Sequence, residues 1–553
     1  MPFPRRLFLA CLLALIPVSA TAVQDAAITA LGRTVLVMEE DATRLTLFNG
    51  GNPAGLALLP DPNRLDVTVY AFQRERRAEF SPGLAYDPNP ARPEFEKDRS
   101  TLDPHGNTLV PESIVTRQRR SLSFGLTGSD IGGYGVIIAR LAEGWTLQSD
   151  RHSRVEEAWS TQYTGRDWDA SGGGRLRAAV KAFPGLAFGA GFGFSDRHAK
   201  YHTSPDLSAE TATSMYPYDT LLALRSQGLT AETGAALRLP SVFEEDDYLD
   251  LGVTLNAARE ETRADAWIPS TAFGVEPSAR HDLVRDEPWR ARFQGVYQYE
   301  GRMDVGLTLD YLEDRVFRSL ATTSEETPEY LASRRRDWDY EIGIRLRIPM
   351  VREEDLRFGV TFSNQAEGHF YPTGRTQDYA PDGRPDGPPM DTLASSIGIG
   401  TAFVPGPGSL IALEYRLGST KSREGSVQVA KSGFSRFGFG AQYALFKRFF
   451  LRLGFSNRLV DHEINQEIGG EIVLLRRSEE IQDYTLGLGL EEGPWRIDAA
   501  ATFERVLHSP LGWTMRDKPD AIDAYGEGAE DWDAVNQDKT ERIVGRVTLS
   551  LRF

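Results

Sequence analysis

Residues whose side chains could catalyse a reaction or bind a metal ion are scattered along this chain. His198 and His202 stand four residues apart in SDRHAKYHTS. On a strand they would share a face at a separation of about 13 Å, too far for one metal ion. No Gly-x-Ser-x-Gly nucleophile elbow is present. We therefore expect the histidines to be polar residues of a strand end or loop, and we expect no catalytic residues, no metal site and no cofactor.

Two glycine-rich stretches resemble phosphate-binding loops only in composition. SGGGR at 171–175 and FGAGFGF at 188–194 lack the Gly-Lys-Ser/Thr of such a loop and do not open a helix. In the second stretch, Gly189, Gly191 and Gly193 share one face of a strand. If that face lines a lumen, the three glycines predict open space there or a bend in the strand.

An acidic stretch at 515–538 offers hard oxygen ligands at irregular spacing, without the pattern of an EF-hand. Its carboxylates include Asp520, Asp523, Glu527, Glu530, Asp531 and Asp533. Two interpretations remain open. It is either a solvated external loop that divalent ions bridge to the phosphates of lipopolysaccharide, or a specific calcium site.

The elements that must position these residues are strands, because apolar and polar residues alternate along most of the chain. In DWDYEIGIRLRIP one face carries Trp338, Tyr340, Ile342, Ile344, Leu346 and Ile348. The other face carries Asp337, Asp339, Glu341, Gly343, Arg345 and Arg347. RMDVGLTLDYLED and RFGFGAQYALF repeat the pattern. A soluble sandwich and a membrane barrel both show such strands, but only in a barrel does the apolar face meet lipid.

The connections between strands favour the barrel. Short turns alternate with long polar stretches, which we place near 80–112, 151–171, 204–216, 263–286, 319–335, 371–390, 421–432, 461–475 and 509–537. Tight periplasmic turns, long external loops and an even strand count are typical of outer-membrane barrels. We predict an all-β, transmembrane, antiparallel up-and-down β-barrel of about 14–18 strands over residues 64–553. Tyr311, Trp338, Tyr340, Tyr484 and Trp495 are the expected aromatic girdle.

The beginning of the chain predicts export. A basic start, MPFPRR, precedes the apolar run LFLACLLALIPV and the small residues at 20–22, as in a secretory signal peptide over 1–22. An uncleaved anchor helix is the alternative. The only cysteine, Cys11, lies in this segment, so the mature chain has no disulfides. A net charge of -17 argues against nucleic acid as a partner. We expect the outer membrane of a Gram-negative-type bacterium as the location.

The chain ends on a strand pattern, RIVGRVTLSLRF. Its lipid face is predicted to carry Val547, Leu549, Leu551 and the terminal Phe553. In hydrocarbon a sheet can have no free edge, so the last strand must pair with the first. An ending of this kind resembles the signal that barrel-assembly machinery reads, which makes that machinery an expected partner.

Residues 23–63 lack strand alternation and precede the first strand. They combine turn-forming residues with apolar ones, which predicts a plug inside the lumen; a loose periplasmic tail is the alternative. Asp41-Ala42 and the later Asn52-Pro53-Ala54-Gly55-Leu56 resemble the N-terminal hatch of the long-chain fatty-acid transporter family. In that family an Asn-Pro-Ala-Gly turn leads into the first strand.

The resemblance implies a monomeric barrel with a hatch, binding of hydrophobic molecules, and their release through a gap in the wall. Its hatch and ligand residues here are Phe48, Asn49, Gly50, Gly51, Asn52, Pro53 and Gly55. Four functions stay open: a transporter of hydrophobic small molecules, a diffusion porin with a charged lumen, a structural or adhesive surface protein, and an outer-membrane hydrolase. The expected partners are outer-membrane lipid, lipopolysaccharide and a small-molecule substrate.

Overall fold

The computed structural model describes residues 52–58, 63–79, 112–128, 137–156, 161–206, 220–267, 278–322, 326–350, 354–364, 373–446, 448–468, 471–516 and 538–552. Within these ranges the chain forms one short 3-10 helix, η1 (Pro53–Leu58), and one antiparallel sheet of nineteen strands. No helix in them is long and apolar enough to cross a membrane.

The strands follow one another around the sheet in chain order. They are β1 (Arg64–Glu79), β2 (Glu112–Gly128), β3 (Ile137–Glu156), β4 (Thr161–Phe183), β5 (Leu186–Asp206), β6 (Thr220–Pro240), β7 (Tyr248–Trp267), β8 (Ser278–Tyr299), β9 (Met303–Thr322), β10 (Glu326–Pro349), β11 (Asp355–Ser363), β12 (Gly374–Asp378), β13 (Met390–Gly406), β14 (Ser409–Glu424), β15 (Val427–Phe446), β16 (Phe449–Ile468), β17 (Glu471–Glu492), β18 (Trp495–Arg516) and β19 (Asp538–Arg552).

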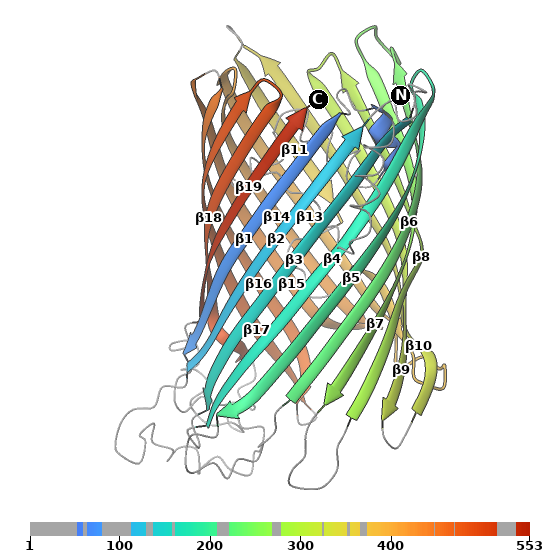
Figure 1. Cartoon of the computed structure of the whole chain (residues 1–553), viewed down its shortest axis with the longest axis vertical. Helices are drawn as coiled ribbons and strands as arrows, with labels where there is room; N and C mark the ends of the chain where they lie inside the picture. Colours follow the sequence, from blue (N-terminus) through green and yellow to red (C-terminus); the bar gives the residue numbers. More distant parts are fainter. Residues whose placement is uncertain are drawn as a thin grey trace, which may run out of the picture.

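The sheet closes on itself, because β1 pairs with both β2 and β19. The seam runs from Arg64 opposite Arg552 to Ala78 opposite Asp538, and Figure 1 shows β19 beside β1. On the lumenal side of the seam, the Ser550 hydroxyl donates to Asp66 at 2.7 Å. The predicted closure by the last strand is confirmed, whereas Phe553 lies outside the described residues.

Two of the nineteen segments share one place in the wall. β10 pairs with β11 through Glu341–Pro349 and with β12 through Ser333–Arg336, and β13 likewise pairs with both. The nineteen segments therefore occupy eighteen positions, an even number at the upper end of the predicted range. Between β11 and β12, Asn364 accepts a hydrogen bond from the Tyr340 amide at 2.6 Å and so bridges part of the interruption.

The two faces of the wall have the polarity that the sequence predicts. Trp338 and Ile344 are 66% and 47% exposed on the outer face, whereas Asp310 and Asp337 on the inner face are about 5% exposed. Outward Tyr311 and Trp338 lie with ring centroids 4.7 Å apart, as expected for neighbours in an aromatic girdle. The apolar face meets lipid, and the polar face lines the lumen.

The prediction of long external loops is wrong in extent. Residues 151–171, 263–286, 319–335, 421–432 and 461–475 are mostly strand; β3 and β4, for example, stay paired up to Glu156 opposite Thr161. A strand needs only about 9–11 residues to cross a bilayer, yet β10 has 24. The polar residues of these segments mark where the wall leaves the membrane. They do not mark the end of a strand, because the backbone hydrogen bonds between strands continue in water.

The turn between β6 and β7 is organised by one buried carboxylate. Asp247 accepts hydrogen bonds from the amides of Val242 at 2.6 Å, Phe243 at 2.9 Å and Glu244 at 3.1 Å, and from the Tyr297 hydroxyl at 2.8 Å. Burial acts to raise the pKa of Asp247, but these hydrogen bonds outweigh it and the pKa lies below its usual value.

This turn should therefore lose stability only in acid. A carboxylate with a lowered pKa stabilises the fold at pH values above its unfolded pKa, about 4, and this contribution disappears as the pH falls through the lower folded value. We expect the amides of residues 242–244 to keep their protection between pH 5 and 8 and to lose it progressively as the pH falls below about 4 towards the lower folded pKa of Asp247. Hydrogen exchange measures this. Asp247→Asn should expose these amides already at pH 7; equal protection in the variant would contradict the assignment.

Candidate functional site

The best-defined site in the lumen is a patch of small residues on the inner wall. The patch consists of residues on three adjacent strands: Ala179 of β4, Ala187 and Gly189 of β5, and Gly234 and Ala236 of β6. Their neighbours along the chain, such as Phe188, point outward. We call these five residues the small-residue platform. Helix η1 packs on it: Ala54, Leu56 and Ala57 form one buried cluster with the three platform alanines.

The segment on the platform is held in shape by its own sequence. The Ala54 amide donates to Asn52 Oδ1 at 3.0 Å, and the Gly55 amide donates to the Asn52 carbonyl at 3.1 Å. An asparagine commonly initiates a turn in this way, and Pro53 fixes the backbone dihedral that follows. The other end of the Asn52 side chain faces the wall, where Nδ2 donates to the carbonyls of Ala235 at 3.0 Å and Val253 at 3.4 Å.

Two glycines permit this close approach. A β-carbon on Gly189 would lie 2.4 Å from the Ala54 amide nitrogen, and one on Gly234 would lie 2.3 Å from Asn52 Oδ1. The sequence predicted open space beside Gly189, and the structure fills that space with residues 53 and 54. Asn52 and Leu56 are 1% and 2% exposed, and burying a leucine contributes about 1.5–3 kcal/mol.

An ion pair borders the platform on its external side. Arg177 of β4 donates to Glu232 of β6 through Nε at 2.5 Å and through Nη2 at 2.9 Å. The two side chains meet over Gly191 of β5, which lies between them. Glu232 occupies the space above Gly191, where a β-carbon would meet its carboxylate. Arg177 and Glu232 each stand two residues from a platform residue, so the pair forms the next row of the inner wall.

The structure tests only part of the predicted hatch. Asn52, Pro53 and Gly55 lie on the platform, whereas Phe48, Asn49, Gly50 and Gly51 lie outside the described residues. Strands β4, β5 and β6 are paired without a register shift where they contact η1, so no gap in the wall adjoins it among the described strands. The expected gap is not found at this place.

The other predicted residues are separate from the platform. Val547, Leu549 and Leu551 lie on the outer side of the seam strand, where Val547 is 45% exposed. His198 lies on the outer face with Nε2 2.9 Å from Asp196, and the described residues contain no group of three metal-ligating side chains. Residues 517–537 of the acidic stretch lie outside the described residues.

Sequence reasoning predicted a charged lumen but missed how the charges are arranged. Several described lumenal arginines lie beside a carboxylate on the same strand or one or two strands away: Arg238 with Asp250, Arg290 and Arg292 with Asp310, Arg345 with Asp304, Arg416 with Glu414, and Arg452 and Arg496 with Asp498. Such local pairs neutralise each other. They tie neighbouring strands together and do not form a zone of one sign that would select ions.

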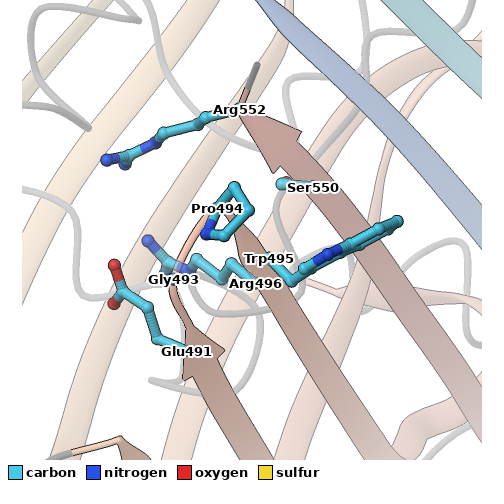
Figure 2. A pocket seen from close by; sticks show the side chains of 7 residues that line it. All are labelled: Glu491, Gly493, Pro494, Trp495, Arg496, Ser550 and Arg552. Carbon is cyan, nitrogen blue, oxygen red and sulfur yellow. The ribbon is translucent and has the colours of Figure 1, made fainter.

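A small hollow at the turn between β17 and β18 offers no substrate site. Figure 2 shows Glu491, Arg496 and Arg552 on one side of this turn, with the Trp495 ring extending to the other. Its free volume of about 20 Å³ holds about one water molecule. The platform therefore remains the candidate site.

Comparison with known proteins gives similarity only at the level of solved structures. No family model and no curated protein match this chain. The toluene transporter TodX of Pseudomonas putida is 12% identical with a TM-score of 0.35, covering 96% of this chain and 98% of its own. A FadL homologue of Pseudomonas aeruginosa is 10% identical with a TM-score of 0.36, covering 97% and 99%.

A third structure, the ferric yersiniabactin uptake receptor FyuA of Yersinia pestis, is 8% identical with a TM-score of 0.43, covering 90% of this chain and 81% of its own. At these identities and TM-scores the comparisons add nothing to the fold described above.

Proposed function

We propose that this barrel carries hydrophobic small molecules passively across the outer membrane, with residues 23–63 as a hatch anchored on the small-residue platform. The observation that supports the proposal is the contact itself. On three adjacent strands, Gly189 lies close to the backbone of Pro53 and Ala54, Gly234 lies close to the Asn52 side chain, and three alanines pack against Ala54, Leu56 and Ala57. A segment without function would not need such a fitted place on the inner wall.

A barrel of this size needs a segment inside it if the lumen is to be closed. A wall of 16–18 strands encloses an aqueous channel unless something fills it. This wall has eighteen positions. Because described lumenal arginines such as Arg238, Arg290, Arg345 and Arg452 are paired with carboxylates, this part of the lumen has little net attraction for ions, which fits an uncharged cargo better than an ionic one.

A diffusion porin is the second candidate, and the barrel size favours it. The two functions differ in what the native protein does in a membrane. In planar bilayers we expect the native barrel to be nearly closed to ions, because the hatch fills the lumen. In cells we expect it to speed the entry of a hydrophobic fluorescent dye but not of a small polar sugar. Large, steady conductance together with sugar entry would reject the transporter and support the porin.

A further inference from the structure

The outer face of β9 and β10 carries an unusual group of arginines. Arg315 Nε and Nη2 lie 3.0 and 2.9 Å from Glu313 Oε1, and Arg334 Nη2 lies 2.6 Å from the same oxygen. Arg336 Nε lies 3.9 Å from the other carboxylate oxygen. Three guanidinium groups thus surround one carboxylate, which leaves two positive charges in excess. We call the three arginines and Glu313 the arginine cluster.

The cluster faces outward, beside lipid, and not into the lumen. Arg336 stands opposite Glu313 and Trp338 stands opposite Tyr311 in the same uninterrupted register. Since side chains two residues apart share a face, Arg334 and Arg336 point the same way as the exposed Trp338. Their side chains are 31% and 53% exposed, whereas that of Glu313 is only 6% exposed.

Its height on the wall is that of lipid headgroups. The girdle residues Trp289, Tyr311 and Trp338 form a continuous ring contact, with centroids 5.0 and 4.7 Å apart. Arg336 and Arg334 lie two and four residues beyond Trp338, on the external side. At about 3.3 Å per residue they stand roughly 7 and 13 Å along the strand from the girdle, directly above the lipid-facing isoleucines of β10.

The neighbouring strands show that this arrangement is not general. Arg259, Arg263 and Arg280 lie on the same outer face of β7 and β8, but each has its own carboxylate two residues on, at 3.0 to 3.1 Å. Only on β9 and β10 do three described arginines share one acid. Arg334 Nε is also buried without a hydrogen-bond partner among the described residues. The cluster therefore has positive charge and donor capacity that the protein itself does not use.

We propose that Arg315, Arg334 and Arg336 bind the phosphate of a phosphorylated glycolipid in the outer leaflet. Guanidinium groups bind phosphate through paired, charge-assisted hydrogen bonds. Glu313 holds two of the three side chains in position before the lipid binds. The acyl chains then lie below the girdle along Ile342 and Ile344, and the sugar rests against the aromatic rings. This site is independent of what the lumen transports.

The test compares glycolipids with and without phosphate on the purified full-length barrel. Native mass spectrometry counts bound lipid A and dephosphorylated lipid A in titrations. We expect the native protein to bind the phosphorylated form about tenfold more tightly, since each arginine near an anionic headgroup contributes severalfold. The triple variant Arg315→Gln, Arg334→Gln, Arg336→Gln should lose this preference.

The matched control is Arg259→Gln, Arg263→Gln, Arg280→Gln, which removes the same charge from the same face of the wall. It should keep the preference, and heat-modifiable mobility on gels should show that both variants are folded. If both triple variants lose binding equally, or if the native protein does not distinguish the two lipids, the site is rejected. Should the cluster variant fail to fold, Arg336→Gln, the most exposed of the three, replaces it and should lower the preference by severalfold.

Discussion

Gly189→Val should open the barrel to ions. The added β-carbon would meet the backbone of Pro53 and Ala54 at 2.4 to 2.5 Å, and backbone atoms cannot move aside as a flexible side chain can. We expect the segment at 52–58 to leave the small-residue platform while the wall remains intact, because the hydrogen bonds of the wall do not depend on it. Single-channel recordings should then show a large, steady conductance, whereas we expect the native protein to be nearly closed.

The control is Gly306→Val on β9. Gly306 is also a lumenal glycine in a strand, but a β-carbon there would lie no nearer than 4.0 Å to another atom. This variant should conduct as little as the native protein. Unchanged conductance in Gly189→Val, with a folded barrel, would show that the contact on the platform does not close the lumen.

Ile344→Arg should reduce the stability of the barrel strongly. Ile344 lies on the lipid face of β10, midway between Tyr340 and the periplasmic turn, and is 47% exposed. Arginine near the bilayer midplane costs about 2–4 kcal/mol in a membrane barrel. Reversible unfolding in urea, with the protein in lipid vesicles, measures the loss.

Glu341→Arg is the comparison for this effect. Glu341 is three residues away on the same strand and faces the lumen, where it is exposed to water. We expect it to change the free energy of unfolding by no more than about 0.5 kcal/mol. Similar losses at both positions would mean that the two faces of the wall have been assigned the wrong way round.

Much of the wall could be predicted from the sequence, because alternation directly reports which residues face lipid. The faces of β9, β10 and β15 and the pairing of β19 with β1 follow from this periodicity. Strand ends could not be predicted. The polar residues of β3, β4 and β8 were interpreted as loops, because polarity marks the limit of the membrane and not the limit of the hydrogen-bond ladder.

The two parts of the candidate site could be predicted from the sequence, but the contact between them could not. The open face at Gly189 was evident from the glycines at every second position of β5, and the turn at Asn52-Pro53 was evident from its composition. That the two fit together depends on a contact between residues more than 130 positions apart. The same limit applies to the arginine cluster, whose excess charge appears only when β9 and β10 are set in register.

The length of the strands has a consequence for what meets the cell from outside. β10 has 24 residues, and twelve of them, 326–337, precede the girdle residue Trp338 on the external side. At about 3.3 Å per residue and a tilt near 40°, these residues raise the rim roughly 30 Å above the girdle. The wall thus continues beyond the girdle as a rigid cylinder of paired strands. Its rim is exposed to large particles such as an antibody or a phage tail. Sequence changes on this rim can alter such recognition without touching the platform, because the paired strands between them keep the two ends apart.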